Sequence, residues 1–180
     1  MRFIPFLIIN RRLARSSFLG LVFGIVFSTI PTGTLFAQTN TPTITQTAVC
    51  PTNAWAGWTL SGFWHPKSSG PCLQAYGGGN PLWYGQDATC NYDNGLTNSG
   101  DAITPAWIIP AGGATLSFMS WEQTEGGSFY DTRQVYISTT GLGGPWTQLW
   151  VSTNAYVSAW YGVSVDVSAY SGQVAQFRFN

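Results

Sequence analysis

Charged residues are scarce in this chain of 180 residues, because Asp, Glu, Lys and Arg together make up only 8%, against about a quarter in ordinary soluble domains. No acidic residue occurs before Asp87, and only Lys67, Arg133 and Arg178 supply positive charge after residue 15. From residue 39 onward, seven acids therefore stand against three bases. A nucleic-acid-binding surface needs a basic stripe that neutralises phosphates, so the composition argues against that role.

Motifs of catalysis are also missing. After residue 38 the chain has no HExxH, GxSxG or GxxxxGK[ST] pattern, the signatures of zinc peptidases, α/β-hydrolases and phosphate-binding loops. Its single histidine, His65, lies between Trp64 and Pro66 at the entry to a predicted loop. A Ser-His-Asp triad would have to be built around that ring without a recognisable nucleophile motif. We therefore expect His65 to be structural, with its ring nitrogens bonded to loop backbone, and the chain to be non-catalytic.

The first 38 residues have the pattern of a secretory signal peptide. Four arginines and no acid lie in residues 1–15, an apolar run covers Phe18–Ile30, and Pro31 and small residues lead to Ala37. The apolar run is shorter than the ~20 residues that a membrane anchor needs, which favours cleavage over anchoring. We expect a cleaved leader over 1–38, a Thr-rich linker over 39–50, and a secreted, extracellular or cell-surface protein without a membrane span.

Three cysteines, Cys50, Cys72 and Cys90, follow the predicted leader. None has the CxxC spacing of zinc or thioredoxin-like sites. In an oxidising compartment we expect one disulfide and one remaining thiol. The segment between Cys72 and Cys90 contains the densest cluster of turn residues, which favours that pairing, although sequence alone leaves the other two pairings open.

The chain beyond the linker shows the two-residue alternation of β-strands rather than a helical period. Three segments place the following apolar residues on one face: Ala114, Leu116 and Phe118; Val135 and Ile137; and Ala175, Phe177 and Phe179. Glycine-rich turn clusters separate these segments, and the nine tryptophans mostly belong in a core. The pattern predicts one all-β domain, a sandwich or barrel of antiparallel strands.

Six segments in order resemble a known family. They are residues 62–65 (GFWH), 82–86 (LWYGQ), 90–95 (CNYDNG), 98–100 (NSG), 121–126 (WEQTEG) and 165–173 (VDVSAYSGQ). Together they are similar to the MAM-like jelly-roll domain of secreted bacterial proteins, an accessory module beside proteases of the bacillopeptidase F and immune inhibitor A type. The resemblance implies a concanavalin-like β-sandwich over 51–180. Family members continue past Phe177–Phe179 into a closing strand, so we expect this domain to be truncated.

Four acidic residues are candidate calcium ligands. Asp93, Glu122, Glu125 and Asp131 lie in or near predicted loops, and calcium takes six to eight hard oxygen ligands, some of them backbone carbonyls of Gly-rich turns. The resemblance to jelly-roll modules implies a structural calcium. Their hard oxygen atoms, on loops, make Glu125 and Asp131 the leading ligands. Glu122 and Glu125 could also form a glycosidase pair, but their odd separation on a strand points them to opposite faces.

Two aromatic pairs are candidate binding residues. Trp83–Tyr84 and Trp160–Tyr161 each alternate faces on a predicted strand, so one ring of each pair could be exposed. Exposed rings stack on sugars and anchor protein interfaces, whereas buried rings only pack the core.

These observations predict a secreted, non-catalytic β-sandwich that serves adhesion or substrate targeting, or supports a larger extracellular protein. Its expected partner is an extracellular glycan or protein surface. Two rivals stay open: a fragment of a secreted protease whose catalytic domain lies outside this chain, and a carbohydrate-binding module.

Overall fold

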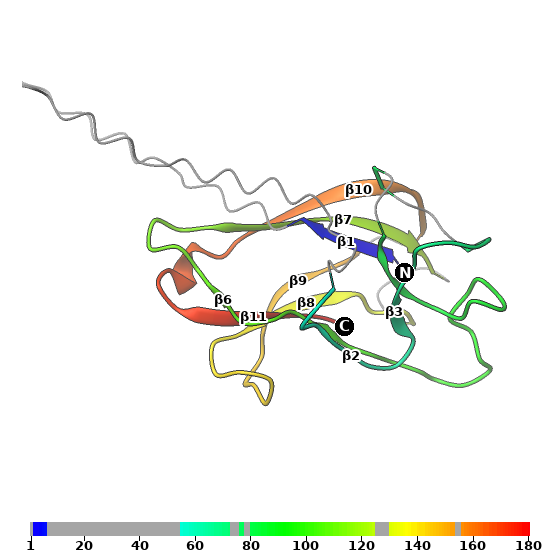
Figure 1. The fold of residues 1–180 in the computed structure, drawn as a ribbon, viewed down its shortest axis with the longest axis horizontal. Coiled ribbons are helices and arrows are strands. Elements are labelled where there is room, and N and C mark those ends of the chain that lie inside the picture. Colours follow the sequence, from blue (N-terminus) through cyan, green and yellow to red (C-terminus); the bar gives the residue numbers. More distant parts are fainter. Residues whose placement is uncertain (1, 7–54, 73–75, 78–79, 125–129, 154–155) are drawn as a thin grey trace, which may run out of the picture.

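The computed structural model describes an antiparallel β-sandwich (Figure 1) built from residues 2–6, 55–72, 76–77, 80–124, 130–153 and 156–180. Most of the predicted leader, the predicted linker, Cys50 and Glu125 lie outside the described residues. Within the described part, no helix has the length and apolar character needed to cross a membrane.

Within the described residues, the first sheet has five strands in the order β10-β7-β1-β4-β3. Their bounds are β10 Tyr156–Asp166, β7 Thr115–Gln123, β1 Arg2–Phe6, β4 Leu82–Tyr84 and β3 Trp64–Pro66. Every neighbouring pair in this sheet is antiparallel. A register shift between Val157 and Tyr161 interrupts the pairing of β10 with β7.

The second sheet follows the order β2-β5-β11-β8-β9, with β6 also paired to β11. The bounds are β2 Thr59–Leu60, β5 Ala102–Ile103, β11 Val174–Phe179, β8 Gln134–Ser138, β9 Thr147–Val151 and β6 Trp107–Ile108. A single 3-10 turn, η1 Ser168–Tyr170, connects β10 to β11. Asp166 accepts a 2.9 Å hydrogen bond from the Ser168 backbone N–H at this turn, as expected for an Asp that stabilises a turn.

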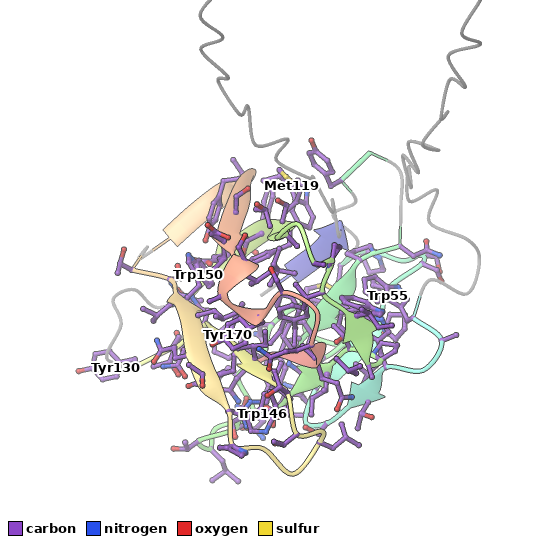
Figure 2. The ribbon with its side chains drawn as sticks, turned by 90° about the vertical axis from the view of Figure 1, so that its left-hand side faces the viewer. Trp55, Met119, Tyr130, Trp146, Trp150 and Tyr170 are labelled. Atoms are coloured by element: carbon purple, nitrogen blue, oxygen red, sulfur yellow. A yellow bond between two sulfur atoms is a disulfide. The ribbon has the colours of Figure 1, made fainter. Side chains whose placement is uncertain are left out.

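The core lies between the two sheets and consists of the apolar positions that alternation predicted. Side chains of β7 and β11 alternate between buried and half-buried or exposed positions, and Leu116, Phe118, Phe177 and Phe179 are fully buried. Phe118 and Phe179, from opposite sheets, meet edge to face with ring centroids 5.3 Å apart, a favoured geometry for aromatic pairs. Figure 2 shows side chains filling the space between the two layers, and the half-buried Trp150 ring packs on Phe118 with ring centroids 5.5 Å apart. The all-β antiparallel sandwich predicted from the sequence is confirmed.

Strand β1 was not expected, because Arg2–Phe6 belongs to the predicted leader. It occupies an interior position of the first sheet, where Phe3 pairs with Ser120 of β7 on one side and with Leu82 of β4 on the other. The sheet therefore includes a segment that the sequence analysis assigned to export rather than to the domain.

Candidate functional site

Long loops gather at the end of the sandwich where β4, β7 and β11 finish. The connection from β4 to β5 contributes residues 85–101, and it packs on the loop before β3. Gly62 has φ +62°, and a Cβ there would lie 2.5 Å from the Ser99 carbonyl oxygen, while a Cβ on Gly100 would lie 2.4 Å from the Ser61 oxygen. Such close backbone approach requires glycine on both sides. Two of the six sequence motifs, residues 62–65 and 98–100, therefore pack against each other in the fold.

A disulfide holds the start of the long loop. Cys72 and Cys90 are bonded, the pairing that the sequence favoured. Beside them the Lys67 ammonium donates a 2.6 Å hydrogen bond to the Asp87 carboxylate. That bond, with a smaller contribution from His65, holds the pKa of Asp87 below its ordinary value. The covalent and ionic links together fix the loop to the segment that follows β3.

A small pocket of about 100 Å³ opens at this end of the sandwich. Four aromatic rings line it together with side-chain amides, hydroxyls and one carboxylate: Trp64, Tyr84, Tyr92, Tyr130, Asn98, Asn180, Ser99, Thr124, Thr132 and Asp131, with Gly100. Tyr130 is 81% exposed and projects from the molecule at the edge of the fold (Figure 2).

Internal hydrogen bonds hold the pocket wall in place. Tyr84 Oη donates to Asn98 Oδ1 at 2.8 Å, and the Asn98 amide donates to the Tyr92 carbonyl oxygen at 3.1 Å. Trp64 Nε1 donates to the Gly100 carbonyl oxygen at 3.1 Å. Burial raises the pKa of Tyr84 above its ordinary value, so its hydroxyl stays protonated and able to donate.

A fully buried ion pair lies next to the pocket. Arg133 Nη2 and Glu122 Oε2 are 3.0 Å apart, and neither side chain is exposed to solvent. Ser152 Oγ donates to Glu122 Oε2 at 2.7 Å, while Tyr161 Oη and Ser120 Oγ donate to Oε1. Hydroxyl donors therefore surround the carboxylate, which is the arrangement that a buried charge requires.

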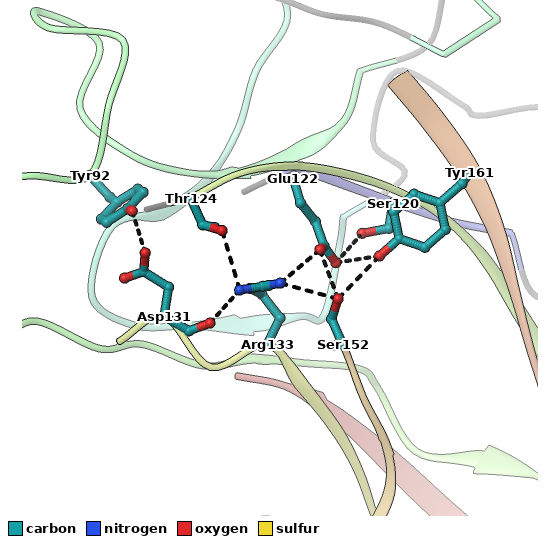
Figure 3. Close-up of polar contacts among 8 residues, drawn as sticks. All are labelled: Tyr92, Ser120, Glu122, Thr124, Asp131, Arg133, Ser152 and Tyr161. Atoms are coloured by element: carbon teal, nitrogen blue, oxygen red, sulfur yellow. Dashed lines mark hydrogen bonds and ion pairs between the residues drawn. The ribbon is translucent and has the colours of Figure 1, made fainter. Parts of the chain in front are cut away.

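The ion pair continues into the pocket through Asp131, as Figure 3 shows. Arg133 Nη1 donates to the Asp131 carbonyl oxygen and to Thr124 Oγ1, and the Asp131 carboxylate accepts a 2.6 Å hydrogen bond from Tyr92 Oη. Arg133 thus supports both Thr124 and Asp131 at the pocket wall. On the far side of the cluster, burial and the hydrogen bond to Glu122 raise the pKa of Tyr161.

The placement of Trp83 and Tyr84 corrects the expectation that one ring of this pair is exposed. Tyr84 faces the core and lines the pocket, with 9% exposure. Trp83 is only 2% exposed, because His65 and Lys67 of the neighbouring strand segment cover its ring. Neither ring of this pair is a free stacking surface.

In the second pair, Trp160 and Tyr161, the two rings face opposite ways, as alternation predicted. Tyr161 points inward to Glu122, and Trp160 faces outward, half-buried. The Trp160 ring contacts Trp121 and Tyr76, with centroid distances of 5.9 Å to each and ring planes inclined by 63° and 61°. Because the rings are inclined to one another, they do not form one flat platform.

Of the four predicted metal ligands, Asp93, Glu122 and Asp131 lie in the described part of the chain, and these three have separate hydrogen-bond partners. The ion pair and the hydroxyl donors engage both oxygens of Glu122, Asp131 bonds Tyr92, and exposed Asp93 accepts a hydrogen bond from Gly95. Among the residues that the structure describes, no group of three or more His, Cys, Asp or Glu side chains could hold a metal ion. Calcium stays a prediction, with Asp93, Glu122, Glu125 and Asp131 as its candidate ligands.

His65 has a loop contact of the expected kind. Its Nδ1 lies 2.9 Å from the Phe63 carbonyl oxygen, a contact that fits the Nδ1–H tautomer, and Nε2 lies 3.3 Å from Asp87 Oδ1. In a catalytic triad the two ring nitrogens face an acid and a nucleophile. Here one faces a backbone carbonyl, so the geometry fits the structural role.

Sequence reasoning missed Arg133, Ser152 and Tyr92 as parts of the site. The two-residue alternation could have indicated Arg133. Glu122 has the same parity as Leu116 and Phe118, and Arg133 has the same parity as Val135, so both charges fall at inward positions. An inward acid and an inward base in one small core indicate a buried pair, since unpaired buried charges are rare. No comparable pattern links Tyr92 to Asp131.

No family model matches the chain. An aligned stretch of 129 residues, 69% of the chain, is 33% identical to Bacillopeptidase F of Bacillus subtilis (strain 168). The chain spans only 8% of the length of that protein. The similarity therefore concerns a small part of a protein that is named as a peptidase, and it is compatible with an accessory or fragment role for this chain.

Proposed function

We propose that the chain is a non-catalytic accessory module of a larger extracellular protein, and that it attaches that protein to a glycan through the loop-end pocket. The observation that carries the proposal is the pocket itself. Its walls combine aromatic rings with amide and hydroxyl groups, and a buried ion pair and a hydrogen-bond network support them. Binding sites with fixed polar groups among apolar walls orient a ligand without paying for reorganisation.

The pocket chemistry favours a sugar over a charged ligand. Asp131 is the only charged side chain in the described lining, and Tyr92 already donates to it. Neutral amides and hydroxyls suit the hydroxyl groups of a sugar, and the exposed Tyr130 ring can stack on its apolar face. A volume of about 100 Å³ accommodates part of one sugar unit, which favours the end or a branch of a glycan.

The similarity to part of Bacillopeptidase F supports the accessory role and also the rival, a fragment of a secreted protease. The two readings agree about this chain and differ about its parent protein. Under both, the described residues hold no peptidase activity of their own. Casein hydrolysis by the purified chain that His65→Ala abolishes would overturn the non-catalytic proposal.

A retention assay tests the glycan proposal. The purified full chain is mixed with insoluble chitin, cellulose or bacterial cell wall, and the bound fraction is measured after washing. We expect retention on at least one polymer and a loss of about tenfold in affinity for Tyr130→Ala, the effect of removing a binding anchor. Leu142→Ala is the matched control, because Leu142 is exposed but does not line the pocket. Equal loss in both variants, or no retention on any polymer, would argue against the pocket.

A further inference from the structure

The long connection from β4 to β5 contains an Asn-Gly pair, Asn94–Gly95, in an exposed stretch. In such a pair the side-chain amide carbon is open to attack by the following backbone nitrogen, because glycine places no side chain beside that nitrogen. Gly95 has φ +75°, and within the described part of the chain a Cβ built on it would meet no atom within 4 Å. Residues 93–97 are all exposed, so water also reaches the pair.

Hydrogen bonds on both sides of the pair restrain the loop. Before the pair, Gln86 Nε2 donates to the Asp93 carbonyl oxygen at 2.7 Å. After it, Asn98 Nδ2 donates to the carbonyl oxygens of Tyr92 and Leu96 at 3.1 and 3.2 Å. Groups that are held in place before a reaction lose less entropy when they meet, which lowers the barrier to the reaction.

Three more hydrogen bonds engage the atoms of the pair itself. The Gly95 backbone N–H donates to Asp93 Oδ1 at 2.8 Å. Asn94 Oδ1 accepts from the Leu96 backbone N–H at 3.0 Å and from Asn98 Nδ2 at 3.3 Å. The bond from Leu96 closes a turn that folds the Asn94 side chain back along its own backbone. The attacking nitrogen therefore has a base beside it, and the carbonyl oxygen has two donors, which is the arrangement that accelerates acyl transfer.

We propose that Asn94–Gly95 is a self-modification site, at which the folded loop promotes the deamidation of Asn94. The Gly95 nitrogen forms a bond to Asn94 Cγ while its proton passes to Asp93 Oδ1. The Leu96 N–H and the Asn98 amide stabilise the negative charge that develops on Asn94 Oδ1. Asp93 then gives the proton to the side-chain nitrogen of Asn94, the bond from Cγ to that nitrogen breaks, and ammonia leaves. Water opens the resulting succinimide to aspartate or isoaspartate.

The product changes the loop beside the pocket. Aspartate adds a negative charge next to Asp93, and isoaspartate also lengthens the backbone by a methylene group between residues 94 and 95. The altered residue is a hydrogen-bond partner of Asn98, which lines the pocket. The inference concerns the chemistry of the loop and is independent of the glycan proposal, so the retention assay and the test below can fail separately.

The test compares the folded chain with a peptide that lacks the fold. The purified full chain and a synthetic peptide of residues 91–99 are incubated at neutral pH with EDTA, so that no calcium ion can occupy Asp93. Peptide mapping by mass spectrometry follows the conversion of Asn94, and a methyltransferase specific for isoaspartate identifies that product. We expect Asn94 to react about tenfold or more faster in the folded chain, because a positioned base and oxyanion donors each accelerate the reaction.

Two variants separate the effect of the loop from ordinary Asn-Gly reactivity. Asp93→Asn keeps an oxygen that can accept from the Gly95 N–H but removes the base, so the rate in the folded chain should fall about tenfold. Asp166→Asn is the matched control, because Asp166 also accepts a bond from a backbone N–H, that of Ser168, and lies outside this loop. Its rate at Asn94 should equal that of wild type.

Two results would overturn the proposal. A rate in the folded chain no higher than the peptide rate would show that the hydrogen bonds protect the pair instead of promoting its reaction. Equal rates in Asp93→Asn and wild type would show that the Asp93 carboxylate takes no part. If circular dichroism shows that Asp93→Asn does not fold, the comparison of the folded wild type with the peptide decides the proposal by itself.

Discussion

The buried Glu122–Arg133 pair offers the sharpest prediction about stability. Glu122→Gln keeps the shape of the side chain, but its one carbonyl oxygen replaces only one of the two carboxylate oxygens that accept from Ser152 and Tyr161. It also leaves the guanidinium of Arg133 buried without a counter-charge. Removal of one partner of a buried ion pair costs about 3–5 kcal/mol. That is a large fraction of the roughly 5–15 kcal/mol that stabilises an ordinary domain.

Urea denaturation of the full chain measures this cost. With a slope of about 2 kcal/mol per M, Glu122→Gln should lower the midpoint by roughly 1.5–2.5 M. Arg133→Met should lower it comparably, because it leaves a buried carboxylate. The double variant should be more stable than the sum of the two losses predicts, since it contains no buried charge.

The control is Asp93→Asn, which neutralises an exposed acid and should change stability by no more than about 0.5 kcal/mol. If Glu122→Gln shifts the midpoint no more than this control, the pair is not a structural charge pair and the reasoning is refuted. If the single variants do not fold, the double variant decides the matter, and its failure to fold contradicts the account.

Three further predictions concern the loop end. Replacing Cys72 and Cys90 together by alanine should cost about 3 kcal/mol in urea denaturation, because the bond closes a loop over 18 residues; a cost near zero would show that other contacts hold the loop. Asp87 has a lowered pKa in the fold, so its stabilisation is present above its unfolded pKa and is lost as the pH falls through its folded pKa. Lys67→Met should therefore raise the pKa of Asp87 in a carboxyl-carbon NMR titration, and an unchanged value would contradict the contact. If Asp131 helps to bind calcium, EDTA should lower the Tm of the full chain and added calcium should restore it by mass action, whereas an unchanged Tm would remove calcium from the account.

The fold could be predicted because successive side chains of a strand point to opposite faces, so that every second residue is buried. Alternation over Ala114–Phe118 and Ala175–Phe179 leaves one arrangement in which the apolar side chains avoid water, and the structure adopts it. Alternation also predicted that Trp160 and Tyr161 face opposite ways, and the structure shows that Tyr161 is the one that points inward. Alternation did not predict the burial of Trp83, because His65 and Lys67 cover the outer face of β4. A two-residue pattern shows which face of a strand a residue is on, but not whether other side chains cover that face.

The rest of the site depends on contacts between distant segments. Tyr92 and Asp131 are 39 residues apart, and neither residue type indicates the other. The pocket exists because Gly62 and Gly100 let two loops approach closely, which is a property of the assembled backbone. Strand β1 was the hardest element to predict from the sequence, because its residues also fit an export signal.

A titration of the isotope-labelled full chain with chitotriose and with cellotriose, followed by NMR, would show whether the loop-end pocket binds a glycan. We expect saturable shifts of the Trp64 indole N–H and the Asn98 side-chain amide, which line the pocket, and little change at the Trp160 indole outside it. Shifts confined to Trp160, or no shift with either sugar, would contradict the proposal that the loop-end pocket binds a glycan.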